Sequence, residues 1–300
     1  MDYGIYKSIC EKYKADYSEN QALFQYTSFK IGGSCPLLIK PNSTECLCEL
    51  MSAFAQNNHS YKVMGKGSNL LISDKGVGCP VILISSDLGE ISFSDNEVNC
   101  QAGLSLISLC NEAAKRELTG LEFAYGIPGS VGGAVYMNAG AYGGEMRDII
   151  TSCTYADEKG KLHQIKKEDM NLSYRHSFFS GKPYIITDVT LKLQKGDKKA
   201  ITDKMQELMN KRREKQPLEY PSAGSTFKRP ERDFAGRLIE AAGMKGFTMG
   251  GAQVSEKHCG FVVNKGNAAY DDVISVINAV KSSVKETSGI ALECEVIIWE

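Results

Sequence analysis

The spacing of hydrophobic and polar positions predicts a strand–helix–strand unit near the start of the chain, after a short helical segment over Met1–Tyr17. Cys35–Lys40 and Tyr61–Met64 are apolar runs of strand length. Between them, Ser43 or Thr44 can cap a helix. The apolar positions on one face of this helix are Leu47, Leu50, Met51 and Phe54. Two strands joined through a helix usually pair in parallel, so we expect a parallel pair here.

Alternating patterns further along the chain indicate antiparallel strands and one more helix. The predicted segments are a hairpin of Ile91–Phe93 with Val98–Ala102, a helix capped by Ser105 and reaching Glu117, a hairpin of Ile149–Tyr155 with Leu162–Ile165, and a strand over Tyr184–Leu193. Asp95-Asn96 and Glu158-Lys159-Gly160 supply the turn residues of the two hairpins.

A polar break over residues 194–199 predicts a domain boundary. We expect one domain over residues 1–194 and a smaller one over residues 195–300. The elements predicted after the break are a helix ending near Arg213, a helix over Phe234–Gly243, a helix over Tyr270–Thr287 ended by Gly289, and a strand over Ile290–Trp299. Helices and strands that alternate in this way are typical of an α+β or α/β protein with a mixed sheet.

The segment Thr119–Met146 interrupts these regular patterns, because eight of the 29 glycines lie in it. Glycine weakens a helix or strand by roughly 0.5–1 kcal/mol relative to alanine, so we expect no ordinary element here. Apolar and aromatic residues between the glycines argue against a flexible linker. Backbone N–H groups exposed by glycine can bind a large ligand. The segment therefore predicts a buried, glycine-lined binding site for a large cofactor.

Composition narrows the class of protein. A hydrophobic content of 42%, a charged content of 24% and a net charge of −1 are typical of a globular protein and give no electrostatic case for nucleic acid or an anionic membrane. We expect neither a signal peptide nor a membrane span. The ten cysteines fit reduced thiols of a cytoplasmic protein, and the four histidines share no metal-ligand spacing. We expect no metal site.

The loop Gly65–Asn69 is glycine-rich and follows a predicted strand, yet it does not complete a dinucleotide-binding fingerprint. Leu70 occupies the place of the third glycine, and more strand follows instead of a helix. Two interpretations stay open. The loop is either a turn between strands or a phosphate-binding loop that uses backbone N–H groups, Lys66 and the Ser68 hydroxyl.

Three single residues could carry chemistry, and each has a plainer interpretation. Arg175, in Tyr174-Arg175-His176-Ser177, is either an anion binder or a structural clamp, and the residues alone favour the clamp. Ser225 follows Gly224 but lacks the surroundings of a nucleophilic serine, so a turn serine is the default. Alternation would put Glu295 beside bulky apolar neighbours, where burial tends to raise a carboxyl pKa. A solvent-facing glutamate is equally compatible with the pattern.

Two basic clusters flank Ser225. Lys211, Arg212, Arg213 and Lys215 end a predicted helix, where positive charge suits the helix dipole. Lys228 and Arg229 form the second cluster. A phosphate-bearing substrate is the alternative explanation for both.

Taken together, these motifs resemble the UDP-N-acetylenolpyruvoylglucosamine reductase (MurB) family of bacterial flavoenzymes. The resemblance rests on Thr27–Gly33, Gly65–Asn69, Gly120–Gly144, Tyr174–Ser177, Ala223–Pro230, Ala235–Gly246 and Leu292–Val296, in the family's order and spacing. With no inserted segment after Tyr174, the chain looks like the shorter subclass, which lacks a substrate-clamping tyrosine loop. Cys294 departs from the residues common at its position and neighbours Glu295.

The resemblance implies a two-lobed FAD-binding domain of the vanillyl-alcohol-oxidase (PCMH) type, followed by a smaller α+β substrate domain. No histidine stands in the two glycine-rich stretches, so non-covalent FAD is expected. The residues implied to bind the cofactor are Gly65, Lys66, Gly67, Ser68, Asn69, Gly126, Pro128, Gly129, Gly132, Gly133 and Asn138.

The implied reaction is NADPH-dependent reduction of UDP-N-acetylglucosamine enolpyruvate to UDP-N-acetylmuramate in peptidoglycan precursor synthesis. By match to the family, Arg175 stabilises developing negative charge, Ser225 donates a proton and Glu295 polarises the enolpyruvyl group. Tyr174, Lys215 and Arg229 would bind the phosphates or carboxylate of the substrate.

The expected partners are small molecules only, for a cytoplasmic enzyme that works as a monomer. Two alternatives remain at this point. One is a flavin oxidase of the same fold that acts on an alcohol or sugar, and the other is a non-enzymatic flavin-binding module.

Overall fold

The computed structural model describes residues 3–300, which divide into two compact units. Unit 1 holds the N-terminal residues up to Glu19, Leu37–Lys66 and Cys79–Asn210. Unit 2 holds Asn20–Pro36, Gly67–Gly78 and Lys211–Glu300. The two units meet within the long helix α6 (Lys198–Lys215), between Asn210 and Lys211. The domain boundary expected at residue 194 stays a prediction.

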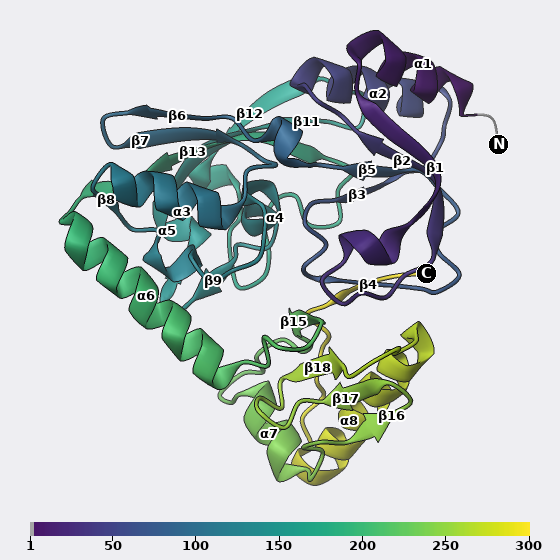
Figure 1. Ribbon diagram of the computed structural model, residues 1–300, viewed down its shortest axis with the longest axis vertical. Helices are drawn as coiled ribbons and strands as arrows, with labels where there is room; N and C mark the ends of the chain where they lie inside the picture. Colours follow the sequence, from purple (N-terminus) through teal and green to yellow (C-terminus); the bar gives the residue numbers. More distant parts are fainter. Residues whose placement is uncertain (1–2) are drawn as a thin grey trace. The chain divides into compact units, whose positions relative to one another are not determined.

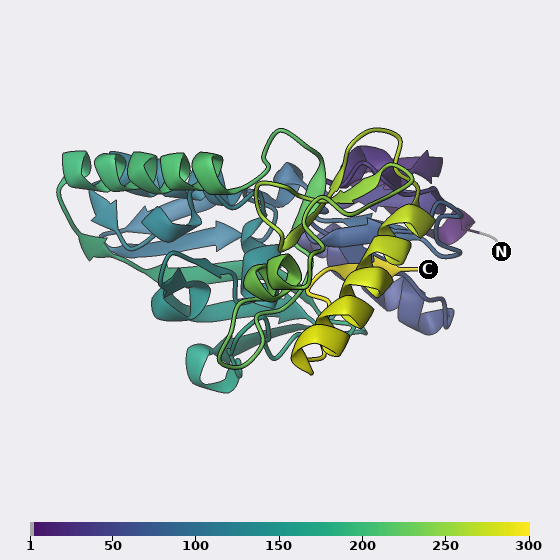
Figure 2. The ribbon, with the colours of Figure 1, turned by 90° about the horizontal axis from the view of Figure 1, so that it is seen from below.

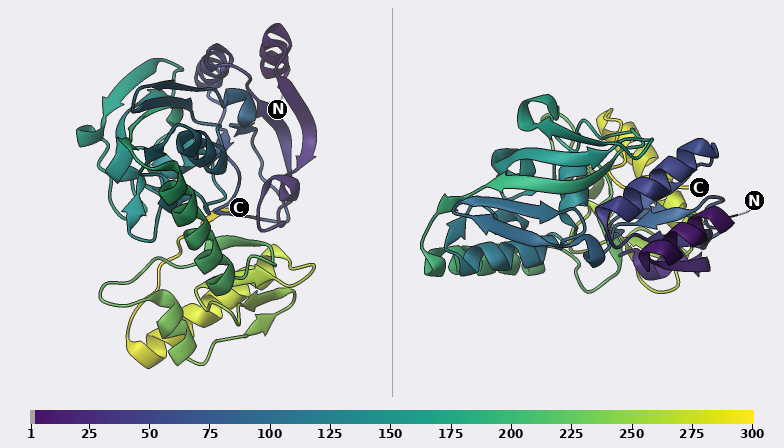
Figure 3. Two further views of the ribbon diagram at one scale, coloured as in Figure 1. Left: turned by 60° about the vertical axis from the view of Figure 1, so that its left-hand side comes forward. Right: turned by 90° about the horizontal axis from the view of Figure 1, so that it is seen from above.

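The first sheet has the strand order β1-β2-β5-β3 (Figure 1). Its strands are β1 (Asp16–Ala22), β2 (Ser34–Lys40), β3 (Lys62–Met64) and β5 (Val81–Leu83). β2 and β3 both pair with β5 in parallel. The predicted parallel arrangement is confirmed, but β5 lies between the two strands that were expected to pair. The crossover helix α2 (Thr44–Gln56) begins after Ser43, whose side chain accepts from the Cys46 N–H. Figure 3 shows α2 beside α1 (Gly4–Tyr13).

The second sheet of unit 1 is antiparallel, with the order β12-β11-β13-β7-β6. Its strands are β6 (Ile91–Ser94), β7 (Glu97–Gln101), β11 (Ile150–Ala156), β12 (Leu162–Lys166) and β13 (Ile185–Lys192). Both predicted hairpins are confirmed, as is helix α3 (Leu106–Lys115) with its Ser105 cap. A small pair joins β8 (Leu118–Thr119) to β14 (Gln194–Lys195).

The glycine-rich segment does contain a regular element, contrary to expectation. α4 (Val131–Tyr136) begins after Ser130, whose hydroxyl accepts from the Gly133 N–H. Val131 and Val135 of this helix are fully buried, so packing compensates for the low helix propensity of glycine. The neighbouring elements are η3 (Glu122–Ala124), β9 (Gly140–Ala141), β10 (Gly144–Glu145) and α5 (Met146–Ile149).

Unit 2 is built on an antiparallel sheet with the order β15-β18-β17-β16. The strands are β15 (Ser222–Ser225), β16 (Thr248–Met249), β17 (Ala252–Val254) and β18 (Phe261–Asn264). Helix α8 (Tyr270–Ser288), yellow in Figure 2, packs on β16, β17 and β18 and also contacts α7 (Ala235–Ala241). It ends at Gly289, whose φ of +74° requires glycine or a strained residue.

The predicted final strand over Ile290–Trp299 is mostly wrong. Only β19 (Ile297–Trp299) is a regular strand, and it pairs in parallel with β4 (Leu70–Ile72). Before it, the chain makes an isolated bridge from Cys294 to Phe227. The predicted alternation of faces fails accordingly, because Glu293 is exposed and Trp299 is buried although both were assigned to one face.

The remaining short helices are η1 (Leu23–Tyr26), η2 (Ser86–Leu88) and η4 (Lys167–Asp169). Each unit has its own hydrophobic core. Within residues 3–300, no helix combines the length and the apolar character that a membrane crossing requires.

Candidate active site

In unit 1, the loop after β3 lies against the start of α4. A Cβ atom added to Gly65 would stand 2.6 Å from Ser130 Oγ, closer than real Cβ contacts allow. Ser130 is buried and caps α4, so it has little freedom to move away. The main-chain N–H groups of Gly65 and Lys66 donate to no acceptor within residues 3–300. This loop therefore offers two backbone donors at a close backbone approach, as an anionic group requires.

The N–H groups of the glycines at 129, 132 and 133 have acceptors within unit 1. Their N–H groups donate to the Ile127 and Ala102 carbonyls, at 2.9 and 2.8 Å, and to Ser130 Oγ. These three N–H groups are therefore used within the protein. Gly132 instead permits close packing, since a Cβ there would lie 2.7 Å from Ala102 Cβ. Whether Gly126, Pro128 and these glycines line a cofactor stays a prediction.

Gly67, Ser68 and Asn69 belong to unit 2. The Gly67 carbonyl accepts from the Ser28 N–H at 3.2 Å. Asn69 binds the C-terminal segment twice, because its side-chain amide donates to the Glu295 carbonyl at 3.1 Å and its own carbonyl accepts from Ile297. Asn69 therefore holds the main chain of Glu295, a contact that the sequence did not indicate.

Ser225 and Glu295 lie on neighbouring segments of unit 2. Ser225 ends β15 and pairs with Phe261, after a register shift that contains Gly224 at φ +76°. A bulge of this kind re-aims the side chain that follows it. On the other side of Ser225, the Thr226 carbonyl accepts from the Glu295 N–H at 2.8 Å. Two residues predicted to act together are thus brought together within one unit.

Thr226 is a residue that the sequence analysis missed. It is buried, and its hydroxyl accepts from the Val262 N–H at 3.0 Å. Its N–H donates to the Gly260 carbonyl at 2.8 Å. The residue joins β18 to the Glu295 segment. No local sequence signal could have revealed these partners, which lie more than 30 positions away.

Tyr174 and Arg175, in unit 1, form the tip of a tight turn. Ser173 and His176 exchange two main-chain hydrogen bonds of 3.1 Å across it. Arg175 has φ +53°, a left-handed conformation that costs a non-glycine residue about 1–2 kcal/mol. Its guanidinium carbon lies 5.1 Å from the centre of the Tyr174 ring, which is half exposed. Strain of this kind is typical of functional sites.

Asn138 lies behind this turn and is buried. Its side-chain amide donates to the Ser173 carbonyl at 3.0 Å and to Glu145 Oε2 at 2.9 Å, and its carbonyl oxygen accepts from the Arg147 N–H at 2.9 Å. The predicted role of Asn138 in cofactor binding stays a prediction, and its side chain is engaged within the protein.

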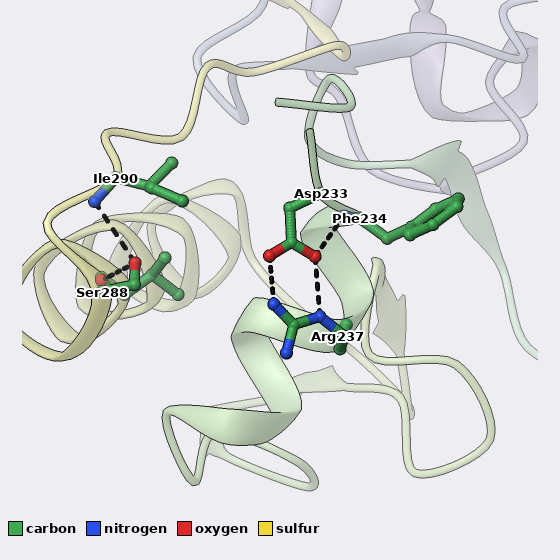
Figure 4. Close-up of polar contacts among 6 residues, drawn as sticks. Asp233, Phe234, Arg237, Ser288 and Ile290 are labelled. Carbon is green, nitrogen blue, oxygen red and sulfur yellow. Dashed lines mark hydrogen bonds and ion pairs between the residues drawn. The ribbon is translucent and has the colours of Figure 1, made fainter. Parts of the chain in front are cut away.

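The basic residues predicted to bind substrate lie in unit 2. Lys215 ends α6, and the Arg229 guanidinium stacks 4.0 Å from the centre of the exposed Phe234 ring. Figure 4 shows the neighbouring pair, in which the Asp233 carboxylate accepts from Arg237 and from the Phe234 N–H. Both contacts favour the charged form and lower the Asp233 pKa to about 2. Within the described residues, no cluster of His, Cys, Asp or Glu could hold a metal ion.

Two family models match the chain. The model of an FAD binding domain matches residues 36–166, which include Gly65–Asn69 and the glycine-rich segment. The model described as the C-terminal domain of UDP-N-acetylenolpyruvoylglucosamine reductase matches residues 216–299, which include Ser225, Arg229 and Glu295.

Similar proteins match over nearly the full length. The UDP-N-acetylenolpyruvoylglucosamine reductase of Clostridium novyi is 46% identical over 95% of this chain and 92% of its own. That of Clostridium perfringens is 43% identical over 98% of this chain and 97% of its own. A crystal structure of UDP-N-acetylenolpyruvylglucosamine reductase (MurB) from Thermus caldophilus matches with a TM-score of 0.80 and 34% identity, covering 95% of this chain and 99% of that one.

Proposed function

The chain belongs to the UDP-N-acetylenolpyruvoylglucosamine reductase (MurB) family, and we propose on that basis that it reduces UDP-N-acetylglucosamine enolpyruvate to UDP-N-acetylmuramate with NADPH, for peptidoglycan synthesis. The observation that carries this function is the 46% identity over 95% of the chain, which spans both the FAD-binding and the C-terminal regions. The oxidase alternative has no comparable support, because the full-length relatives are reductases.

The chain has the FAD-binding fold expected of the family, with a C-terminal α+β domain. The residues of unit 1 fit such a cofactor, because the Gly65 and Lys66 N–H groups have no protein acceptor within residues 3–300 and Gly65 leaves no room for a side chain. FAD held there would supply the hydride-transfer chemistry between NADPH and the terminal carbon of the enolpyruvyl group. We propose that FAD binds without a covalent link and that Gly65–Asn69 contributes to its site.

The remaining chemistry falls to side chains of the protein. Hydride addition to the terminal carbon of the double bond moves its electron pair toward the adjacent carbon and the carboxylate. We assign stabilisation of this charge to the Arg175 guanidinium. Ser225 donates its hydroxyl proton to the adjacent carbon, which completes the reduction, and then regains a proton from solvent. Glu295 polarises the enolpyruvyl group beside Ser225, and the contact between Glu295 and Thr226 supports this pairing.

Substrate binding is assigned to three further residues. Tyr174 presents a half-exposed ring at the tip of the Arg175 turn. Lys215 and Arg229 provide positive charge for the diphosphate or carboxylate of the substrate. We further propose that the enzyme is a cytoplasmic monomer of the shorter subclass, without a tyrosine loop insertion.

The experiment that tests the proposal follows the flavin in the purified protein. A yellow protein that oxidises NADPH only when UDP-N-acetylglucosamine enolpyruvate is present supports the reductase. Oxygen consumption with an alcohol or sugar, without NADPH, would contradict it.

A further inference from the structure

The turn that carries Arg175 is fixed from outside the turn itself. Within it, two main-chain hydrogen bonds between Ser173 and His176 close the turn around the left-handed arginine. A strained backbone conformation persists where the surrounding structure holds it. The backbone position of Arg175 therefore depends on the contacts of Ser173 and of the residues after His176.

Asn138 holds the first side of the turn through its donation to the Ser173 carbonyl. Both hydrogens of its amide and its carbonyl oxygen have protein partners, so the planar group has one orientation. Turning the amide over would place its NH₂ against the Arg147 N–H and its oxygen against two acceptors. Glu145, the second acceptor of Asn138, is itself paired with the Arg147 guanidinium. Asn138, which supports Ser173, is therefore itself held in place by Glu145 and Arg147.

Ser177 holds the second side. Its hydroxyl is buried and donates to the Tyr136 carbonyl at 2.7 Å. Tyr136 is the last residue of α4, and Asn138 follows it by two positions. Both sides of the Arg175 turn are therefore tied to the end of the same short helix, across 35 and 41 positions of sequence.

We propose that Asn138, together with Ser177, is a positioning residue for Arg175: its carboxamide fixes the turn that aims the guanidinium at the developing charge. This inference rests on the proposed role of Arg175. A shift of about 1 Å in such a group can slow a reaction on the order of 100-fold, so loss of the Ser173 contact should affect the step that Arg175 serves.

The test compares the two half-reactions of the FAD-loaded enzyme in rapid mixing. In Asn138→Ala, reoxidation by the enolpyruvyl substrate should slow by roughly 10- to 100-fold, and it should slow more than reduction by NADPH does. In Arg175→Ala/Asn138→Ala, reoxidation should be no slower than in Arg175→Ala, because residues that act as one unit are not additive. Asn96→Ala is the matched control, since its amide donates to the Leu193 carbonyl at 3.0 Å beside another turn, and it should leave both steps unchanged.

A second readout does not depend on turnover. Hydrogen exchange of residues 172–178, without substrate, should be faster in Asn138→Ala than in the unaltered protein and unchanged in Asn96→Ala. Should Asn138→Ala fail to fold, Ser177→Ala tests the other side of the turn with the same measurements and the same expected result.

Several results would overturn the inference. They are equal slowing of both half-reactions in Asn138→Ala, loss of FAD from that variant, or a double variant slower than Arg175→Ala. Normal reoxidation in Asn138→Ala, with slow reoxidation in Arg175→Ala, would reject the positioning role alone. Normal reoxidation in Arg175→Ala would instead reject the proposed role of Arg175.

Discussion

The Glu295 N–H donates to the carbonyl of Thr226 at 2.8 Å, and this bond places the C-terminal segment directly beside Ser225. A second bond, from the Lys228 N–H to the Glu293 carbonyl at 2.8 Å, continues the pairing. Main-chain bonds of this kind survive replacement of the side chains around them. Ser225 and Glu295 can therefore be altered one at a time without separating the two segments.

Replacement of Ser225 by alanine should separate the two half-reactions. Flavin reduction by NADPH should proceed normally, because Ser225 takes no part in it. Reoxidation by the enolpyruvyl substrate should slow by roughly 10²–10⁴-fold, the usual contribution of a general acid. Rapid-mixing absorbance of the flavin measures both steps.

Ser222→Ala is the control for this variant, because Ser222 starts the same strand. It should leave both half-reactions unchanged. If Ser225→Ala reoxidised at the normal rate, another group would have to be the proton donor.

Glu295→Gln should slow the same half-reaction, on the order of 100-fold, because the amide keeps the shape and loses the carboxylate. The main-chain bonds of Glu295 to Thr226 and Asn69 do not involve its side chain, so the substitution leaves the pairing of the two segments in place. Glu293→Gln is the matched control two positions away, where the carboxylate is exposed and pairs with Lys228. Similar rates in the two variants would show that the effect is not specific to Glu295.

The longer helices were predictable from the sequence because their signals are local. Ser43 and Ser105 each accept the hydrogen bond expected of a cap, and Gly289 ends α8 in the left-handed conformation. Each signal lies within one turn of the helix end that it marks. Apolar positions with a period of 3.6 also indicated which faces of α2, α3 and α8 are buried.

The C-terminal strand was not predictable, because its partners are distant in sequence. Alternation over Ile290–Trp299 suggested one strand, but residues before Ile297 pair irregularly with 226–228. In the same way, the glycine content of residues 119–146 did not reveal that the Gly132 N–H donates to the Ala102 carbonyl. Sequence patterns indicate the residues of the site. Backbone groups that are distant in sequence decide which polar atoms of those residues are already hydrogen-bonded within the protein.

Acid should weaken the Asp233–Arg237 pair in a defined pH range. The folded-state pKa of Asp233 is lowered to about 2, below the ordinary value near 3.8, first by Arg237 and then by the Phe234 N–H. A lowered carboxyl pKa stabilises the folded state at neutral pH, and this stabilisation is lost as pH falls from about 4 toward about 2. The difference in urea midpoint between the unaltered protein and Asp233→Asn should therefore shrink over that range.

Asp203→Asn is the control, because Asp203 pairs with Lys199 at exposed positions on α6. Its difference from the unaltered protein should be small at every pH, as for most surface ion pairs. A difference for Asp233→Asn that stayed constant down to pH of about 2 would show that the carboxylate contributes nothing through its charge.

Gly65→Ala should reduce the retention of FAD. The new methyl group would stand 2.6 Å from Ser130 Oγ, and Ser130 cannot retreat without giving up the cap of α4. Either the loop shifts and its two backbone donors move, or α4 is disturbed, at a cost of about 1–3 kcal/mol.

Two measurements test this prediction: the release of FAD on dilution, followed by flavin fluorescence, and the thermal unfolding midpoint. Gly78→Ala is the matched control, since a Cβ there meets no atom within 4 Å. Equal FAD retention in both variants would exclude the Gly65 loop from the cofactor site.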